Sequence, residues 1–143
     1  MGAQGGELIG QALRQNTCLK HLTIAENDLK SDGAECIIQN AGNLEGLNLG
    51  KNYISWRIGT HLQEFLETSK KIKRLDLEFN ELLPKGVKPL SEGLVYNTSL
   101  KHLNLRGNAI RDEGLELIAL ALGENQTLES LNISLNEITP FGI

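Results

Sequence analysis

Several residue types that define other protein classes are scarce in this sequence. It has only two cysteines, Cys18 and Cys36, which could form one disulfide or a redox site at most, and no Cys/His spacing resembles a metal site. Aromatic residues make up only 4% of the chain. We interpret the two cysteines as small apolar side chains, one just before a strand and one within a helix.

An excess of basic charge is lacking too. The 14 lysines and arginines are outnumbered by 18 acidic residues, which gives a net charge of −4. A nucleic-acid surface requires a basic face. No apolar run approaches the ~18–20 residues that span a bilayer. We therefore expect neither a nucleic-acid partner nor a membrane partner.

The sequence does contain one motif that occurs five times. Each copy follows L-x-x-L-x-L-x-x-N-x-L with only Leu/Ile exchange. The copies are LKHLTIAENDL from Leu19, LEGLNLGKNYI from Leu44, IKRLDLEFNEL from Ile72, LKHLNLRGNAI from Leu100 and LESLNISLNEI from Leu128. Their asparagines recur at spacings of 25, 28, 28 and 28 residues and are Asn27, Asn52, Asn80, Asn108 and Asn136. A fixed period of this length indicates a repeat architecture.

Helical patterns fill the intervals between the copies. The first spans residues 5–15, before the first copy. The apolar stripe expected on it consists of Leu8, Ile9, Ala12 and Leu13. The first full repeat is three residues shorter than the others, which predicts the loss of its last helical turn. In the third repeat Pro89 falls within the first two turns of the helix, which predicts a late start or a bend there.

The second repeat departs from the pattern at its strand-to-helix turn. Ile58 stands where other repeats have glycine, and Gly59 follows one residue later, which predicts a local change in the turn. Trp56 lies in the same turn. It either anchors a partner on the rim or packs within the irregular turn, and packing is the favoured interpretation.

Both ends of the chain fall inside a repeat. The chain opens with a helical half, and residues 136–142 repeat the pattern of residues 80–86, where another helix begins. We expect residues 1–143 to form a single repeat domain that is a segment of a longer array. Uncapped ends of a repeat array expose apolar surface, so end-to-end self-association is expected as well.

A strand and a helix in every repeat predict an α/β fold, a right-handed αβ solenoid. The repeated leucines point into the core between strand and helix, and the five asparagines bond backbone groups where each strand ends. A helix is about 10 Å wide and strands lie ~4.8 Å apart, so the stack curves into a horseshoe. The parallel sheet is expected on its concave face and the helices on its convex face.

The 28-residue period with a full helix resembles the ribonuclease-inhibitor-like class of leucine-rich repeats. The resemblance also rests on the phrase G-x-x-x-[LI]-x-x-[AG]-L-x-x-N-x-[ST]-L at residues 86–100 and 114–128. The class includes ribonuclease inhibitor, the Ran GTPase-activating protein and the sensor regions of NOD-like receptors. The resemblance implies a non-catalytic scaffold that binds a partner protein on its concave face and rim. The alternative is a regulatory repeat domain of a small-GTPase activator or of a NOD-like immune receptor. Extracellular leucine-rich repeats usually carry disulfide-bonded caps, so we expect a cytoplasmic protein.

The side chains displayed around each strand form the candidate partner-binding site. They are His21, Asn48, Arg74, Asp76, Glu78, Phe79, His102, Asn104, Arg106 and Asn132. One interpretation is a charged recognition patch with Phe79 as an aromatic anchor. The other is an ordinary solvated sheet face whose arginines and acids pair across strands.

No arrangement of these residues indicates catalysis. Asp76 and Glu78 are two apart on one strand face, and with Arg74 and Arg106 beside them we expect salt bridges instead of an acid–base pair. His21 and His102 are displayed three repeats apart, about 15 Å at ~4.8 Å per strand, too far to share a metal. We therefore expect no catalytic residues, no cofactor and no metal site.

Overall fold

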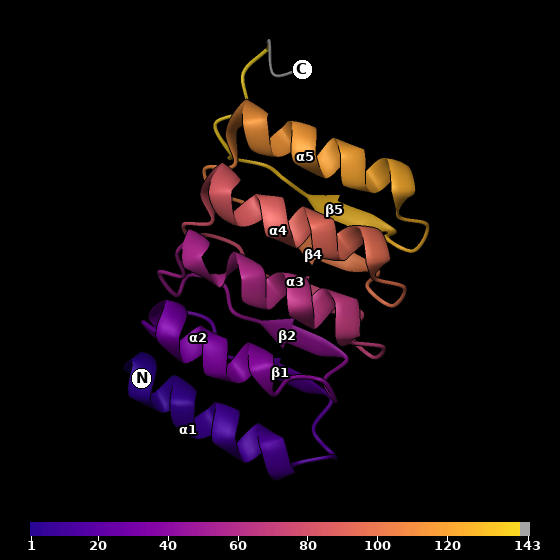
Figure 1. Cartoon of the computed structure of the whole chain (residues 1–143). Coiled ribbons are helices and arrows are strands. Elements are labelled where there is room, and N and C mark those ends of the chain that lie inside the picture. The colour runs from indigo at the N-terminus through magenta and orange to yellow at the C-terminus, as the bar shows by residue number, and fades with distance from the viewer. Residues whose placement is uncertain (141–143) are drawn as a thin grey trace.

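The computed structural model describes residues 1–140, in which helices and strands alternate along the chain (Figure 1). The α-helices are α1 (Gly2–Gln15), α2 (Lys30–Gln39), α3 (Gly59–Thr68), α4 (Leu83–Tyr96) and α5 (Arg111–Glu124). The strands are β1 (His21–Thr23), β2 (Gly46–Asn48), β3 (Arg74–Asp76), β4 (His102–Asn104) and β5 (Ser130–Asn132). A short 3-10 helix, η1 (Trp56–Ile58), precedes α3. The helix expected to begin near residue 142 lies outside the described residues.

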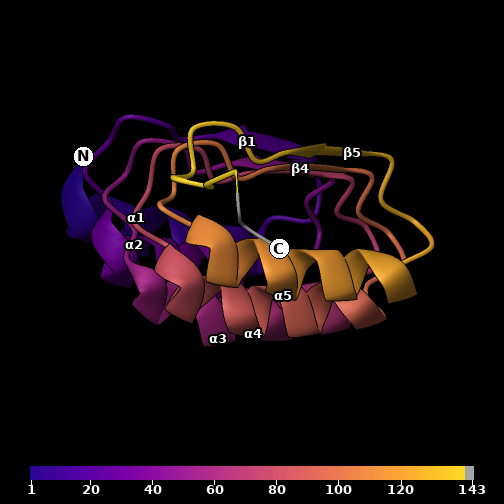
Figure 2. The same cartoon turned by 90° about the horizontal axis from the view of Figure 1, so that it is seen from above.

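The strands form one parallel sheet in the order β1-β2-β3-β4-β5. Their register aligns the same place of every repeat, so that Leu47 lies beside Leu75 and Leu75 beside Leu103. The helices form a second layer on one side of the sheet, as Figure 2 shows. This arrangement confirms the predicted α/β solenoid, with strands in one layer and helices in the other.

The core consists of leucine and isoleucine columns that run through the inner repeats. Equivalent positions such as Leu49, Leu77 and Leu105 are all 0% exposed. In the outer repeats the equivalent residues are less covered, because each repeat is packed on one side only; Leu131, for example, is half-buried. Each fully buried leucine or isoleucine contributes roughly 1.5–3 kcal/mol to folding.

The five repeated asparagines occupy the end of each strand, as predicted. Asn108 shows the pattern: its Nδ2 donates to the carbonyl oxygens of Leu77, Leu105 and Arg106 at 2.9, 3.1 and 3.2 Å. Its backbone N–H donates to Oδ1 of Asn136 at 2.7 Å. The amide therefore satisfies backbone groups of its own repeat and of the repeat before it.

A second series of asparagines supports the opposite end of the repeats. Nδ2 of Asn97 donates to the carbonyl oxygen of Leu66 at 2.8 Å, and its Oδ1 accepts from the backbone N–H of Leu100 at 2.7 Å. Asn125 makes the equivalent bonds one repeat later, to Leu94 O and from Leu128 N. This role was not predicted from the sequence, although the recurring N-x-[ST]-L phrase carries the signal.

Two predicted irregularities are present. Helix α2 has 10 residues where α4 and α5 have 14, as expected from the three missing residues. In the next repeat η1 replaces the direct start of a helix, which confirms the expected change at Ile58. By contrast, α4 begins at Leu83, so the predicted late start at Pro89 is wrong. Pro89 lacks an N–H, yet packing against α3 and α5 keeps the helix continuous.

The predicted apolar stripe of the first helix is partly wrong. The helix begins at Gly2, and Leu8 is 68% exposed. Its buried face is formed by Gly6, Gly10 and Leu13. A Cβ atom on Gly10 would lie 2.5 Å from the carbonyl oxygen of Cys36, so α1 approaches α2 through its glycines. The Leu8 side of the helix consequently faces away from α2, and Ala12 is exposed with it.

The cysteine interpretation holds only in part. Both cysteines are free, but Cys18 is exposed and so fills no core space. Cys36 is half-buried in α2, where its Sγ lies 3.6 Å from the carbonyl oxygen of Glu7. In the described part of the chain, no helix is long and apolar enough to cross a bilayer.

Candidate functional site

The sheet face opposite the helices displays side chains in parallel rows. Because alternate residues of a strand point to opposite faces and the strands are in register, equivalent places line up from β1 to β5. The first row comprises His21, Gly46, Arg74, His102 and Ser130. The second row comprises Thr23, Asn48, Asp76, Asn104 and Asn132. The first row contains one arginine and two histidines, and the second contains three amides, one carboxylate and a threonine.

These rows line a groove of 390 Å³ that residues of all five strands border. We call it the sheet groove. Gly46 leaves an opening in the first row, and the His21 ring occupies part of it: a Cβ atom on Gly46 would lie 2.6 Å from His21 Nδ1. Seven of the ten predicted partner-binding residues line the groove, and they are His21, Asn48, Arg74, Asp76, His102, Asn104 and Asn132. The other three, Glu78, Phe79 and Arg106, follow the ends of β3 and β4. His21 and Asn132 lie on the outer strands β1 and β5.

The acidic residues of the groove are held by an amide. Nδ2 of Asn104 donates to Asp76 Oδ2 at 3.1 Å and to Glu78 Oε2 at 3.3 Å. The other oxygen of Asp76, Oδ1, accepts from the backbone N–H of Glu78 at 2.9 Å. Neutral donors thus hold both carboxylates in place.

The predicted salt bridges between these acids and the arginines are therefore wrong. Within residues 1–140, neither Arg74 nor Arg106 forms an ion pair. The amide of Asn104 takes the place next to the carboxylates, and the guanidinium of Arg106 lies over the Phe79 ring, 5.4 Å from its centroid. Arg74 is exposed in the middle of the first row. The groove thus keeps an unpaired cation available.

Phe79 lies three residues beyond the end of strand β3, outside the residues that line the groove. It is 39% exposed, as predicted for this place in the repeat, and its ring covers Gly107, where a Cβ atom would lie 2.5 Å from Phe79 Cδ1. On the other side Lys51 Nζ lies 6.0 Å from the ring centroid and 2.9 Å from Glu26 Oε1. The hydrogen bond to Glu26 raises the pKa of Lys51. An aromatic ring flanked by cations is a common anchor in protein interfaces.

Backbone N–H groups just after each strand orient the asparagine amides of the second row. Oδ1 of Asn48, Asn104 and Asn132 accepts the backbone N–H two residues later, at 2.9, 3.1 and 3.0 Å. These bonds fix the amide planes, and in the described chain the Nδ2 groups of Asn48 and Asn132 donate to no protein acceptor. Two ordered donors therefore face the groove.

The histidines lie where the repeat predicts them. His21 on β1 and His102 on β4 share the first row and are separated by β2 and β3. Among the described residues no group of three or more His, Cys, Asp or Glu side chains is placed to hold a metal ion. What the arrangement offers chemically is a surface for hydrogen bonds, ion pairs and ring contacts.

Comparisons with known proteins identify the repeated unit. Residues 15–37, 68–91, 96–119 and 124–143 match the family model described as Leucine Rich repeat, which is more than half of the chain. The unmatched stretch after residue 37 contains the end of the shortened helix α2 and η1. The human NACHT, LRR and PYD domains-containing protein 13 is 34% identical over 90 residues, or 60% of this chain. The chain spans only 9% of that relative.

Two solved structures have the same fold. The tropomodulin C-terminal domain of Caenorhabditis elegans superposes with a TM-score of 0.79 at 23% identity, covering 90% of this chain and 82% of that chain. Leiomodin-1 actin-binding site 2 superposes with a TM-score of 0.75 at 17% identity, covering 90% and 77%. At these identities the likeness establishes the fold.

Proposed function

The chain belongs to the leucine-rich repeat family, and from this premise we propose that it is a non-catalytic protein-interaction domain that binds a partner protein in the sheet groove. The observation that carries the proposal is the unpaired, exposed guanidinium of Arg74 in the centre of the groove. Arginine is enriched at the energetic centres of protein interfaces, where its fork of donors pairs with a carboxylate.

The side chains of the two rows indicate which kind of partner segment the groove would bind. Along the first row Arg74 and the two histidines favour carboxylates, whereas the free amide N–H groups of Asn48 and Asn132 favour backbone or side-chain oxygens. Phe79, just beyond the end of β3, adds an apolar contact. The partner segment is thus one with an acidic edge and an apolar side chain placed to reach Phe79. A solved domain of the same fold, leiomodin-1 actin-binding site 2, is named for the protein that it binds, which supports protein binding by this fold.

A charge reversal in the groove tests the proposal. The purified chain is immobilised, and proteins retained from lysate are compared by quantitative mass spectrometry for wild type, Arg74→Glu and Lys70→Glu. Lys70 is exposed in the turn before β3 and carries the same charge as Arg74, so its reversal is the matched control. We expect the retained amount of at least one protein to fall about tenfold with Arg74→Glu, which is equivalent to roughly 1.4 kcal/mol of binding free energy. With Lys70→Glu the retained amount of that protein is expected to equal the wild-type amount. Equal retention by the two variants would contradict the proposal.

A second candidate is the repeat region of a protein that resembles NOD-like receptors. The 34% identity to NACHT, LRR and PYD domains-containing protein 13 favours it over a small-GTPase activator. The sequence of the complete gene decides it: a nucleotide-binding domain encoded upstream supports this candidate, and its absence contradicts it. A GTP-hydrolysis assay with small GTPases tests the activator alternative, for which stimulated hydrolysis is required.

A further inference from the structure

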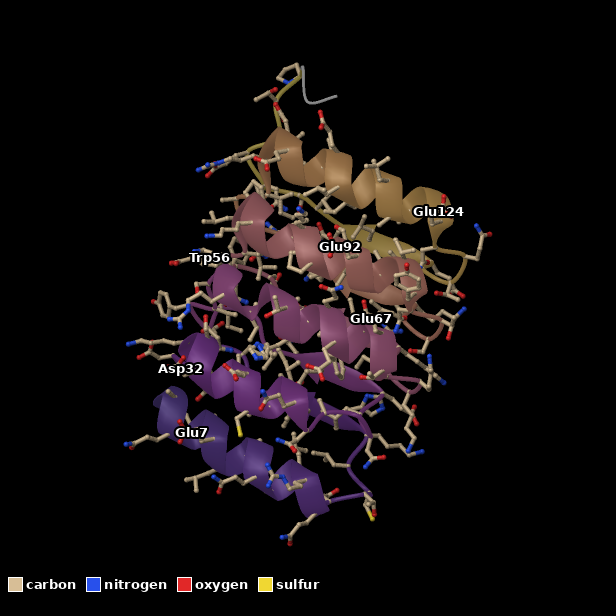
Figure 3. All side chains as sticks on the ribbon, in the orientation of Figure 1. Glu7, Asp32, Trp56, Glu67, Glu92 and Glu124 are labelled. Carbon is tan, nitrogen blue, oxygen red and sulfur yellow. The ribbon has the colours of Figure 1, made fainter. Side chains whose placement is uncertain are left out.

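A second groove lies on the helical side of the molecule, away from the sheet. It has a volume of 380 Å³ and runs between the first turns of η1–α3 and of α4. Its floor and walls include Trp56 from η1 and Pro89 from α4. Figure 3 labels Trp56 at the edge of the molecule where these helices begin. We call this the Trp56 groove; no residue of it belongs to the sheet groove.

The aromatic ring in this groove is open to solvent and covered by a cation. Trp56 is 37% exposed, and Lys85 Nζ lies 3.5 Å from the centroid of its ring. The favoured interpretation from the sequence, packing within an irregular turn, therefore describes only part of the side chain. A cation held on an indole face keeps its remaining hydrogen-bond donors directed outward.

The groove concentrates positive charge in an acidic chain. Arg57, Lys85 and Lys88 line it together with one acid, Glu92, whereas the whole chain has a net charge of −4. Among residues 1–140, no carboxylate lies within ion-pair distance of any of the three cations. Neighbouring cations without a carboxylate partner repel one another, and an anionic ligand offsets that repulsion.

The other repeats show that the fold does not require these cations. One 28-residue period after Lys85 and Lys88, helix α5 carries Glu113 and Glu116. Acids stabilise the first turn of a helix and cations destabilise it, because the N-terminal end carries the positive pole of the helix dipole. The first turns of α2 and α5 contain acids, whereas those of α1 and of the two groove helices, α3 and α4, contain none. The fold therefore does not fix the charge at these places, and the cations at Lys85 and Lys88 are a feature of this repeat.

We propose that the Trp56 groove binds an acidic segment of a partner protein. Carboxylates of the segment pair with Lys85, Lys88 and Arg57. An apolar side chain between them packs beside Pro89, on the part of the Trp56 ring that Lys85 leaves exposed. Both the charge and the aromatic surface of the groove are thereby used. This binding is independent of the sheet groove, because the two grooves share no residue.

The protein contains an intrinsic fluorescence probe for the Trp56 groove. Trp56 is the only tryptophan of the chain, so a change in tryptophan emission reports on this groove alone. A short peptide that alternates glutamate with leucine is titrated into the full chain, with calorimetry as a second readout. We expect saturable binding, a change in Trp56 emission and an affinity that falls steeply as the salt concentration rises. The same peptide with lysine in place of glutamate is expected to leave the emission unchanged.

Two double variants with the same change of net charge distinguish binding in the Trp56 groove from a general effect of net charge. Lys85→Glu/Lys88→Glu gives α4 the residues that α5 has at these places, so the reversal is compatible with this helix, and circular dichroism checks that the variant is folded. Lys70→Glu/Lys73→Glu makes the same change of net charge at exposed positions before β3. We expect the first variant to lose at least about tenfold in affinity for the acidic peptide, and the second to keep wild-type affinity.

Several outcomes would overturn the proposal. They are equal affinity of the two double variants, equal binding of the acidic and basic peptides, or no saturable binding by the folded wild type. A single-stranded RNA oligonucleotide that changes Trp56 emission at lower concentration than the acidic peptide would overturn it too, because the groove would then select a nucleic acid. None of these results bears on Arg74 or the sheet groove.

Discussion

The backbone N–H of Asn52 donates to Oδ1 of Asn80, one repeat further on, at 3.0 Å. The same Oδ1 accepts from the N–H of Ile54 at 3.0 Å, while Nδ2 of Asn80 donates to the carbonyl oxygens of Leu49 and Leu77 at 3.1 and 3.0 Å. Nδ2 also donates to the carbonyl oxygen of Glu78 at 3.4 Å, so one amide joins two repeats through five backbone groups. Bonds between adjacent repeats of this kind give a solenoid its cooperativity.

We predict that Asn80→Ala strongly destabilises the protein. Asn80 is 6% exposed, and its removal leaves buried backbone donors and acceptors without partners, each of which costs about 1–3 kcal/mol. We expect a total loss of roughly 3 kcal/mol or more in the free energy of unfolding, measured by urea denaturation. Asn132→Ala is the control, because Asn132 is exposed and its bonds are local; a loss of about 0.5–1 kcal/mol is expected. Equal losses would contradict the assigned role.

A second prediction concerns the contact between α1 and α2. In an open helix Gly→Ala is stabilising by up to about 1 kcal/mol. At Gly10 the new Cβ atom would meet the Cys36 carbonyl oxygen at 2.5 Å, and backbone cannot move aside as a flexible side chain can. We expect Gly10→Ala to destabilise by about 1–3 kcal/mol and to raise amide hydrogen exchange throughout α1.

Gly123→Ala is the control, because it makes the same substitution in another helix. A Cβ atom at Gly123, near the end of α5, would have no heavy atom within 4 Å. We therefore expect stability to stay the same or to rise by a few tenths of a kcal/mol, measured by the same denaturation experiment. Gly10→Ala without any increase in exchange of α1 would show that the close helix approach is absent in solution.

A third prediction concerns pH. Asp112 accepts hydrogen bonds from the side chain and the backbone N–H of Thr139, at 2.6 and 2.8 Å, which lower the pKa of its carboxyl group. A lowered folded-state pKa gives stability that is present above the unfolded value, about 3.9, and is lost as the pH falls through the folded value. The hydrogen bond from Lys101 likewise lowers the pKa of Glu129, so this contact is also weakened as the pH falls.

The measurement is a carboxyl NMR titration of wild type and Thr139→Val. The variant loses the hydroxyl donor to Asp112, so its Asp112 pKa is expected to move up toward the ordinary value. The pKa of Glu129, which lies beside Lys101, is expected to stay unchanged and serves as the internal control. An Asp112 pKa that is the same in both proteins would contradict this contact.

Much of the fold could be predicted from the sequence because stacking imposes a strict pattern. Leu77 and Leu105 point inward, and Asn80 and Asn108 end the strands, for geometric reasons that recur in every repeat. The shortened α2 and the irregular turn at Ile58 follow from simple counting against the same pattern.

The features that the sequence did not reveal depend on neighbours in space. Leu8 is exposed because glycines on another face of α1 approach α2, which no period within α1 indicates. Arg74 is unpaired because the amide of Asn104 occupies the place beside Asp76, a competition between side chains of neighbouring repeats. The cations around Trp56 come from two repeats and become a cluster only when η1 and α4 are adjacent.

The most direct test of partner binding on the sheet side uses two exposed aromatic residues. Phe79, 39% exposed, follows strand β3 of the sheet groove, and Tyr96, 67% exposed, ends helix α4. Each is replaced by the photo-crosslinking residue benzoylphenylalanine, and adducts formed with proteins of the lysate are identified by mass spectrometry. We predict a defined protein adduct from position 79 that Arg74→Glu abolishes, and no such adduct from position 96. The same adduct from both positions, or one from position 79 that survives Arg74→Glu, would contradict binding in the sheet groove.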